Sequence, residues 1–337
     1  MRLRSASPVS RVVVFITLQY GLATQASAQA FIPAPGDGTI SASYENVVSS
    51  GQHFVRAAGS ASASGFGVTD THALIWYAEY GLSDRIAVHA TLPYIQARYN
   101  GPVRHDIGFK GLPSNTDDGT YHGTFQDFYI GTRFKLVESS RFALTPFAEV
   151  IVPSHQYEAA AQAAAGRDLR ALVAGVAVGG FADDVLPGLH FQTRVSFAFV
   201  EKAVDVRPNR TAIDSAVGYF ITPRLAIQFI ETFQLTHDGI DWGVGPYFLA
   251  VHHDGTWKDD YGPNHDRLAR SNYLNFGAGV AFDFTEKIGV FATFTRLAWG
   301  ENMPSPRTAT VGINWNLHTH RSGARANGSV SRPAAFQ

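Results

Sequence analysis

Apolar and polar residues alternate with a period of two along much of the chain. In the segment 125–137, one set of alternate positions is apolar or threonine: Phe128, Ile130, Thr132, Phe134 and Leu136. The other set is polar, aromatic or glycine: Asp127, Tyr129, Gly131, Arg133 and Lys135. A helix would mix the two sets around its circumference, whereas successive side chains of a strand point to opposite faces. The pattern therefore predicts β-strands with one apolar and one polar face.

The same alternation recurs in 190–200, 274–284 and 311–317. Applied to the whole sequence, it predicts strands at 39–48, 71–82, 85–98, 124–137, 141–152, 169–180, 190–200, 211–221, 224–236, 272–284, 287–299 and 308–317. This even number is typical of single-chain bacterial outer-membrane barrels and places both termini on the periplasmic side. Glu231 falls among the lipid-facing residues of its strand, so we expect either a β-bulge or an error in the predicted register there.

The composition is consistent with a surface that faces lipid. Only 16% of the residues are charged, whereas soluble domains carry about a quarter. After Gln29 no segment is long and apolar enough for a transmembrane helix, and the other structure that satisfies every backbone group inside a bilayer is a closed barrel. We therefore predict an all-β fold, a transmembrane antiparallel up-and-down β-barrel of about 12 strands.

The N-terminal residues have the pattern of a secretory signal peptide. Three arginines accompany a short apolar stretch at 12–22, and Ala-Ser-Ala at 26–28 or Ala-Gln-Ala at 28–30 offers a cleavage site. The alternative is a retained membrane helix, which needs about twenty continuous apolar residues. Thr17 and Gln19 interrupt this stretch, which favours cleavage.

The chain is therefore expected to have three parts. Residues 1–28 form a signal peptide, 29–317 form a barrel exported to the bacterial outer membrane, and 318–337 form a polar C-terminal tail that is disordered. Without the three arginines of the signal peptide, 24 basic residues remain against 28 acidic ones. That balance disfavours nucleic acid as a partner, because nucleic-acid binding requires a basic face.

The connections between the predicted strands alternate in length. Tight connections rich in turn-forming residues lie at 82–85, 138–141, 222–224 and 285–287. Long polar connections lie at 50–69, 100–122, 154–168 and 237–270. Short periplasmic turns and long extracellular loops are expected of an outer-membrane barrel. Two connections depart from the rule, since 182–189 is long for a turn and 301–306 is short for a loop.

Three stretches resemble a known family. They are Tyr80-Gly81-Leu82-Ser83-Asp84-Arg85 with Leu92-Pro93-Tyr94, Phe125-Gln126-Asp127-Phe128-Tyr129-Ile130-Gly131-Thr132-Arg133-Phe134-Lys135-Leu136, and Thr145-Pro146-Phe147 with Val152-Pro153-Ser154. They are similar to the outer-membrane transporter family named for the meta-cleavage pathway of phenol degradation, the phenol MetA-pathway family. The resemblance implies a barrel that passes small aromatic or hydrophobic compounds, and it defines no binding residues.

The polar faces of the strands supply the candidate pore-lining residues. They are Tyr77, Glu79, His89, Asp127, Tyr129, Arg133, Lys135, Glu149, His190, Gln192, Arg194, Asp214, Gln228 and Asp283. One interpretation is a polar path whose charged groups set selectivity. The other is a set of ion pairs that plug the barrel. Small residues on the same face favour the open path because they leave space: Gly131, Gly175, Ala177, Gly277, Gly279 and Gly312.

Metal and enzyme hypotheses receive less support from the sequence. The densest histidine and aspartate group comprises His252-His253-Asp254, Asp259-Asp260 and His265-Asp266, but its spacing matches no defined metal site. There are no cysteines, so thiolate chemistry is excluded, and we expect no metal and no cofactor. Ser154 and His155 are the residues a lipid hydrolase would use, yet adjacent strand residues point to opposite faces, which disfavours a bond between them.

We therefore expect a passive channel or transporter for small, aromatic or hydrophobic molecules, with outer-membrane lipids and the solute as its partners. A closed structural or adhesive barrel is the first alternative. A lipid hydrolase of the outer membrane is the second. The sequence leaves the oligomeric state open.

Overall fold

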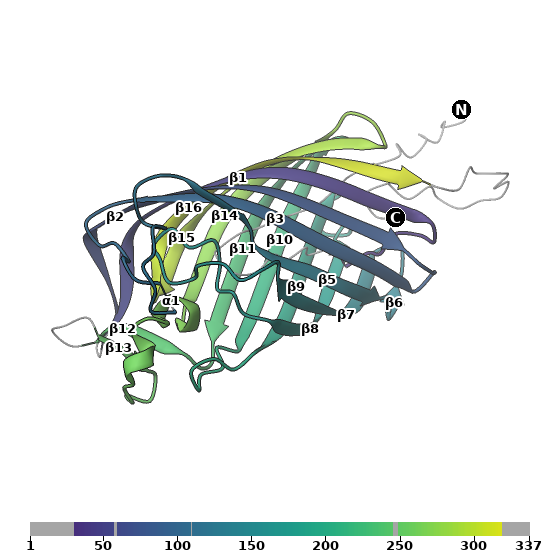
Figure 1. Cartoon of the computed structure of the whole chain (residues 1–337). Helices are drawn as coiled ribbons and strands as arrows, with labels where there is room; N and C mark the ends of the chain where they lie inside the picture. The colour runs from purple at the N-terminus through teal and green to yellow at the C-terminus, as the bar shows by residue number, and fades with distance from the viewer. Residues whose placement is uncertain (1–29, 57–58, 109, 245–248, 319–337) are drawn as a thin grey trace, which may run out of the picture.

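The computed structural model describes residues 30–56, 59–108, 110–244 and 249–318, and these form a β-barrel (Figure 1). The barrel strands are β1 (Asp37–Arg56), β2 (Gly59–Gly81), β3 (Ile86–Asn100), β4 (His122–Phe125), β5 (Asp127–Phe134), β7 (Phe142–Pro153), β8 (Ala171–Phe181), β9 (Leu189–Val200), β10 (Arg210–Thr222), β11 (Leu225–Thr236), β14 (Asn272–Asp283), β15 (Ile288–Glu301) and β16 (Met303–His318). The remaining elements are β6 (Val137–Glu138), β12 (Ile240–Val244), β13 (Leu249–His252), η1 (Asp259–Tyr261) and α1 (His265–Leu268).

The barrel closes because its first and last strands pair with each other. β1 and β16 are antiparallel, with Ile40 opposite Trp315 and Glu45 opposite Thr310. Strands β4 and β5 both pair with β3 and occupy one position in the wall. Within the described ranges the wall therefore has twelve positions, each joined to its chain neighbours by antiparallel hydrogen bonds. The predicted fold class is confirmed.

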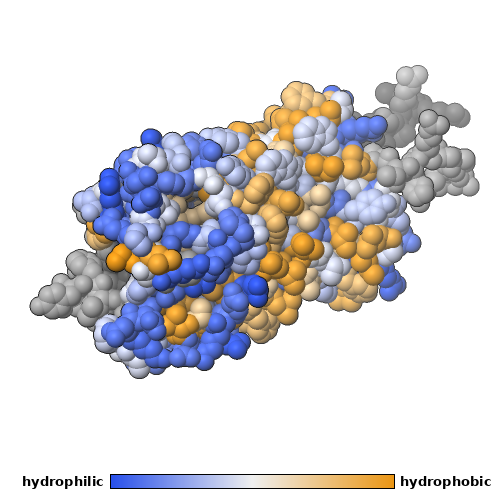
Figure 2. Space-filling model, viewed as in Figure 1, coloured by the Kyte–Doolittle hydropathy of each residue, from blue (hydrophilic) through white to orange (hydrophobic). Residues whose placement is uncertain are grey.

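Side chains alternate between the interior and the outer surface along every wall strand. In β5 the outward-facing side chains are Phe128, Ile130, Thr132 and Phe134 in turn, while Asp127, Tyr129 and Arg133 are buried. Large apolar residues are exposed around the wall, among them Ile130, Leu172, Phe199, Phe229, Phe294 and Val311. Figure 2 shows this apolar surface over the strands and a hydrophilic surface at the end that carries α1. Such a belt is favourable against hydrocarbon rather than water.

Both ends of the described chain lie at the same end of the barrel (Figure 1), which we call the terminal end. The tight turns are at this end, and their geometry is conventional: in the turn after β2, for example, Leu82 N donates to Ile86 O. The opposite end, the loop end, carries the long connections. In outer-membrane barrels in general, the long loops are the extracellular ones.

Two predicted connections are wrong. The segment 50–69 is largely strand, because β1 continues to Arg56 and β2 begins at Gly59. Likewise β16 begins at Met303, so the predicted connection 301–306 contracts to a turn at Asn302, which has a φ of 51°. In both places the strands extend beyond the alternating apolar segments, because hairpin pairing satisfies backbone groups outside the bilayer as well.

The bulge expected at Glu231 is also wrong. Glu231 pairs in register with Ser215 on one side and Phe276 on the other, without a shift. Its neighbour Thr232 is buried in the interior, so Glu231 lies on the outer face. The chain tolerates a partly exposed carboxylate there without disturbing the ladder.

Within the residues that the structure describes, no helix is long and apolar enough to cross a membrane. The predicted signal peptide at 1–28 and the tail from Thr319 onward lie outside the described residues, and both stay predictions.

Candidate functional site

The candidate pore-lining residues face the barrel interior. His89 and Lys135 are partly buried, and the others are buried in the interior: Tyr77, Glu79, Asp127, Tyr129, Arg133, Glu149, His190, Gln192, Arg194, Asp214, Gln228 and Asp283. Their inward direction follows from strand alternation alone. Which of them meet depends on how the strands are placed side by side.

Acidic and basic side chains pair across the interior. Arg133 on β5 forms an ion pair with Glu79 on β2. Glu149 on β7 contacts both His89, at 2.9 Å from Nε2 to Oε2, and Arg194, at 3.5 Å from Nη2 to Oε1. These charges are buried, and pairing offsets part of the desolvation cost of each. The barrel therefore contains a polar layer, defined here as Glu79, Arg133, His89, Glu149 and Arg194.

One carboxylate adjoins the polar layer without a hydrogen bond. Asp214 on β10 lies opposite Arg194 in the strand register. Both of its side-chain oxygens are buried and have no hydrogen-bond partner among the described residues. With Asp214, three carboxyl groups, two guanidinium groups and one imidazole lie at this level of the interior.

Tyr77 stacks on His89 of this layer, with ring centroids 6.2 Å apart, whereas most of the other candidates lie away from it. His190 stacks on Phe220, with ring centroids 4.4 Å apart, and Lys135 pairs with Glu138 at 2.9 Å near the terminal end. Asp127 accepts a hydrogen bond from Tyr157 at 2.6 Å. Gln192, Gln228 and Asp283 are buried elsewhere along the wall.

Three of the interior glycines lie beneath rings of neighbouring strands. A Cβ added at Gly131 would lie 2.6 Å from the imidazole ring of His89, and one added at Gly175 would lie 2.6 Å from the phenyl ring of Phe147. At Gly312 the ring of Phe291 occupies the same place. At these three positions the expectation that glycine leaves open space is wrong, because a ring from a neighbouring strand lies over each.

A short N-terminal segment fills the terminal end of the interior. Ala30, Phe31 and Ile32 are buried. Ala30 and Phe31 pack with Ala143, Ala177, Phe220 and Ala226 of the wall. The carbonyl of Ala30 also accepts a hydrogen bond from the Thr145 hydroxyl. The segment before β1 therefore lies inside the barrel.

A second segment enters from the loop end. The run Ala159–Ala165 in the connection between β7 and β8 is not helical, in contrast to the single helical turn that alanine would favour. Ala159, Ala161, Ala163 and Ala165 are buried, and Ala165 packs with wall residues such as Ile75, Ile95 and Phe291. Small side chains allow this connection to fold into the lumen. We call 154–170 the inner loop.

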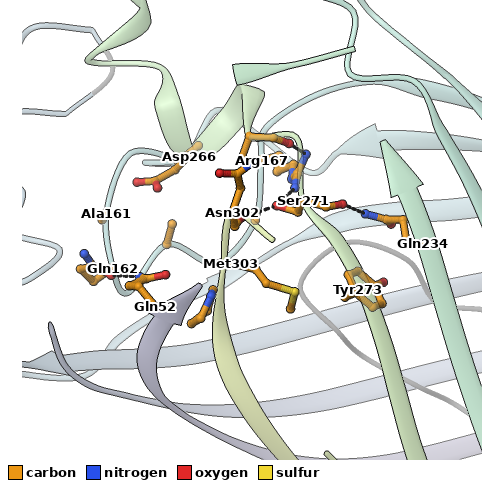
Figure 3. Close-up of a pocket in the computed structure, with 15 residues that line it drawn as sticks. Gln52, Ala161, Gln162, Arg167, Gln234, Asp266, Ser271, Tyr273, Asn302 and Met303 are labelled. Carbon is orange, nitrogen blue, oxygen red and sulfur yellow. Dashed lines mark hydrogen bonds between the residues drawn. The ribbon is translucent and has the colours of Figure 1, made fainter. Parts of the chain in front are cut away.

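A cavity of about 100 Å³ lies between the inner loop and the wall at the loop end (Figure 3). Its polar lining includes Gln162, Arg167, Gln234, Asp266 and Asn302. Burial lowers the pKa of Arg167 to about 9, so its guanidinium is charged at neutral pH. The guanidinium donates to the carbonyl of Ala269 at 3.1 Å and to the Ser271 hydroxyl at 2.9 Å.

Several buried polar residues were not among the candidates. Glu45 on β1 is fully enclosed and accepts a hydrogen bond from Thr310 at 3.1 Å. Strand alternation could have identified it, because Ser41, Ser43 and Glu45 share one face. Arg167 belongs to a connection, where no periodic pattern gives a direction, so the sequence offered no comparable indication.

Ser154 and His155 do form a hydrogen bond, contrary to the sequence argument. Ser154 Oγ lies 2.8 Å from His155 Nδ1, because both residues follow the end of β7 and are free of strand alternation. The Ser154 hydroxyl also lies 2.8 Å from the carbonyl of Phe125, and His155 Nε2 lies 3.0 Å from the Thr124 hydroxyl. Hydrolase triads orient the histidine with a carboxylate or amide, and here a threonine takes that place.

The histidine and aspartate residues of the 237–270 connection separate into two groups. His252 and His253 gather around Asp238, at 2.6 Å and 3.2 Å from its Oδ1. His265 and Asp266, on α1, lie instead beside His105 of the connection between β3 and β4. These residues are close together in the sequence, but in the folded protein they belong to two separate clusters.

No protein-family model matches the sequence, and no curated protein matches it either. Among solved structures, the chain is similar to an outer membrane channel from Pseudomonas putida F1, with 11% sequence identity and a TM-score of 0.62 over 86% of this chain and 98% of that one. The NanC porin matches with a TM-score of 0.45 and 11% identity over 83% and 100% of the two chains. A mutant of the TodX monoaromatic hydrocarbon channel matches with a TM-score of 0.43 and 9% identity over 84% and 91%. At these identities the first similarity establishes a shared fold, a closed twelve-stranded barrel of the outer-membrane type.

Proposed function

We propose that this protein is an outer-membrane channel that passes small, aromatic or hydrophobic molecules by passive diffusion. The observation that carries the proposal is the contrast between the two faces of one closed wall. The outer face is apolar, and the inner face holds the polar layer. A barrel that served only as an anchor would have no need to bury charged groups at the cost of desolvation.

The kind of solute is inferred from what the interior offers. The lumen mixes a few charged groups with aromatic rings, among them Tyr77, Phe147 and Phe291. The inner loop and the N-terminal segment narrow it from both ends. Apolar lining with a few oriented polar groups suits small organic compounds better than large hydrated ones. The resemblance to the phenol MetA-pathway family supports the same solute class.

The proposal is tested with refolded mature protein in planar bilayers and in liposomes. We expect discrete conductance steps and faster uptake of small aromatic solutes than of sugars of equal size. Protein-free liposomes and liposomes with a heat-denatured sample are the controls. Absence of both conductance and uptake would reject the channel function.

A closed structural or adhesive barrel is the second candidate, favoured by the two segments that occupy the lumen. Deleting 106–116 within the connection between β3 and β4 distinguishes the adhesive barrel from the channel. In an adhesive barrel the deletion should abolish binding to the extracellular partner, whereas in a channel it should leave the solute flux unchanged or increase it. If the protein were instead a lipid hydrolase, the Ser154→Ala variant should lose activity on lipid substrates.

A further inference from the structure

Three side chains from two distant connections converge at the loop end. His105 Nε2 lies 3.2 Å from His265 Nε2 and 3.6 Å from Asp266 Oδ2. His265 Nε2 lies 3.3 Å from Asp266 Oδ1. The three side chains are largely shielded from solvent, with exposed fractions of 16%, 25% and 19%. Asp266 Oδ2 is buried and makes no hydrogen bond within the described part of the chain.

The hydrogen bonds of the two imidazoles determine which nitrogens face each other. His105 Nδ1 lies 3.0 Å from the Asp117 carboxylate, and His265 Nδ1 contacts the carbonyl of Gly262. A carboxylate and a carbonyl can only accept, so each Nδ1 carries the proton. Each Nε2 of the neutral ring is then a lone-pair donor. Two such nitrogens and a carboxylate oxygen therefore lie within 4.8 Å of one another, an arrangement that a cation stabilises.

The separations are close to those of ligands that share one metal ion. Metal–ligand bonds of about 2.0–2.2 Å give tetrahedral edges of about 3.3–3.6 Å. The contacts are 3.2 Å between the two Nε2 atoms, 3.3 Å from His265 Nε2 to Asp266 Oδ1 and 3.6 Å from His105 Nε2 to Asp266 Oδ2. One ligand atom from each of the three residues lies within 4.8 Å of the other two, close enough for one ion to bind all three. We propose that His105, His265 and Asp266 form a binding site for a zinc-like divalent cation, with water as the fourth ligand.

The surroundings have the features of a metal site beyond its ligands. Metal-bound histidines usually donate their second ring N–H to a carboxylate or a backbone carbonyl, which fixes the ring and its tautomer. His105 has the first kind of partner and His265 the second. Imidazole with carboxylate suits zinc and related transition metals, whereas magnesium and calcium require oxygen ligands.

The second histidine group differs from the first in the distances between its nitrogen and oxygen atoms. His252 Nε2 lies 2.6 Å from Asp238 Oδ1, and its Nδ1 lies 2.9 Å from Asp254. The first distance is that of a charge-assisted hydrogen bond and is too short for two ligands of one metal. His252 therefore bonds two carboxylates within this group, which provides a matched control in the same connection.

The proposed site would join three connections of the loop end. His105 comes from the connection after β3, and His265 and Asp266 come from the one before β14. Asp117, the partner of His105, also accepts hydrogen bonds from the backbone N–H groups of Gln162 and Ala163 in the inner loop. Asp266 lines the cavity in Figure 3. If the barrel conducts as proposed above, bound metal should hold the inner loop in the lumen and reduce flux.

The test uses the full mature chain, made without a histidine tag, refolded in detergent and stripped of metal with EDTA. Zn²⁺ is titrated by calorimetry, and bound zinc is counted by elemental analysis. We expect one zinc per chain. His105→Gln and Asp266→Asn should each weaken binding at least tenfold, Asp117→Asn by about 10–100-fold, and His253→Gln should leave it unchanged. Co²⁺ should give the intense visible bands of a tetrahedral site, and His105→Gln should remove them.

Each alternative outcome contradicts the site. No saturable zinc binding, or equal binding by wild type and His105→Gln, would show that a proton and not a metal lies between the two imidazoles. If only His253→Gln lost zinc binding, the result would assign the zinc to the second histidine group instead. Heat-dependent gel migration establishes that every variant is folded. Binding is measured without flux, so a failure to conduct would reject the channel and leave the zinc site standing.

Discussion

His89 and Glu149 meet across a glycine. The two residues lie on β3 and β7, which are separated by β5, and Gly131 of β5 is paired with both in the strand register. The missing side chain at Gly131 lets His89 Nε2 approach Glu149 Oε2 to 2.9 Å. The polar layer is therefore built around a strand position where a side chain would interfere.

Gly131→Ala should destabilise the barrel. The added methyl group would lie 2.6 Å from the His89 ring and 2.8 Å from the carbonyl of Ala148, so the ring must move away from Glu149. Overpacking of this kind costs about 1–3 kcal/mol. Urea unfolding of refolded protein measures the change. In Gly262→Ala the new methyl group has only Asp259 O nearby, at 3.8 Å, so this control should match wild type.

Glu149→Gln should cost more, because it removes the negative charge beside Arg194. Breaking a buried ion pair by removing one partner costs about 3–5 kcal/mol. The same urea transition reports it, together with a shift of the reversal potential toward anions in bilayers. Glu231→Gln is the control, since that carboxylate lies on the outer face. Equal effects of the two variants would show that the polar layer contributes nothing specific.

Shortening the chain to begin at Asp37 should increase conductance. The segment removed includes Ala30, Phe31 and Ile32, which are buried in the terminal end of the lumen. Single-channel recording compares the short and long forms. Phe31→Ala should give a smaller increase, and Phe284→Ala, an exposed residue, should give none. Unchanged conductance in the short form would mean that the segment does not limit flux.

Tyr157→Phe should loosen the inner loop. The Tyr157 hydroxyl donates to Asp127 Oδ1 at 2.6 Å and accepts from Asp168 N at 3.0 Å. Burial raises the pKa of Tyr157, so the hydroxyl remains a donor at all working pH values. Loss of these bonds leaves a buried carboxylate oxygen unsatisfied, at a cost of about 1–3 kcal/mol. Protease cleavage within 154–170 should be faster than in Tyr121→Phe, whose hydroxyl bonds Asp70 near the surface.

His252 should titrate above the ordinary histidine value. Burial lowers its pKa, but hydrogen bonds to Asp254 and Asp238 outweigh burial and raise it above 6.5. Because the folded pKa is raised, this pair stabilises the connection fully below the unfolded value, and the contribution is lost as the pH rises through the folded value. NMR titration of ring protons checks the direction. In Asp238→Asn the pKa should fall, and an unchanged value would exclude the pairing.

The sequence determined the architecture because strand alternation is a local property. The alternating segments 125–137 and 190–200 predicted both the wall and the inward face of residues such as Arg133 and Arg194. The tight turns were also predicted, from the serine, proline and aspartate residues between the strands. The alternation did not predict the full lengths of β1, β2 and β16, because the parts of a hairpin outside the bilayer need no apolar face.

Only the tertiary structure decided which groups meet. Ion pairing of Glu79 with Arg133 depends on strand order and register across the closed barrel, which no local pattern encodes. The positions of the connections were not predicted either. His265 is close to His252 in the sequence, yet it lies beside His105 in the structure. The inner loop lies inside the lumen. Connections carry no periodicity, so their positions are set by the packing and hydrogen bonds of the folded barrel.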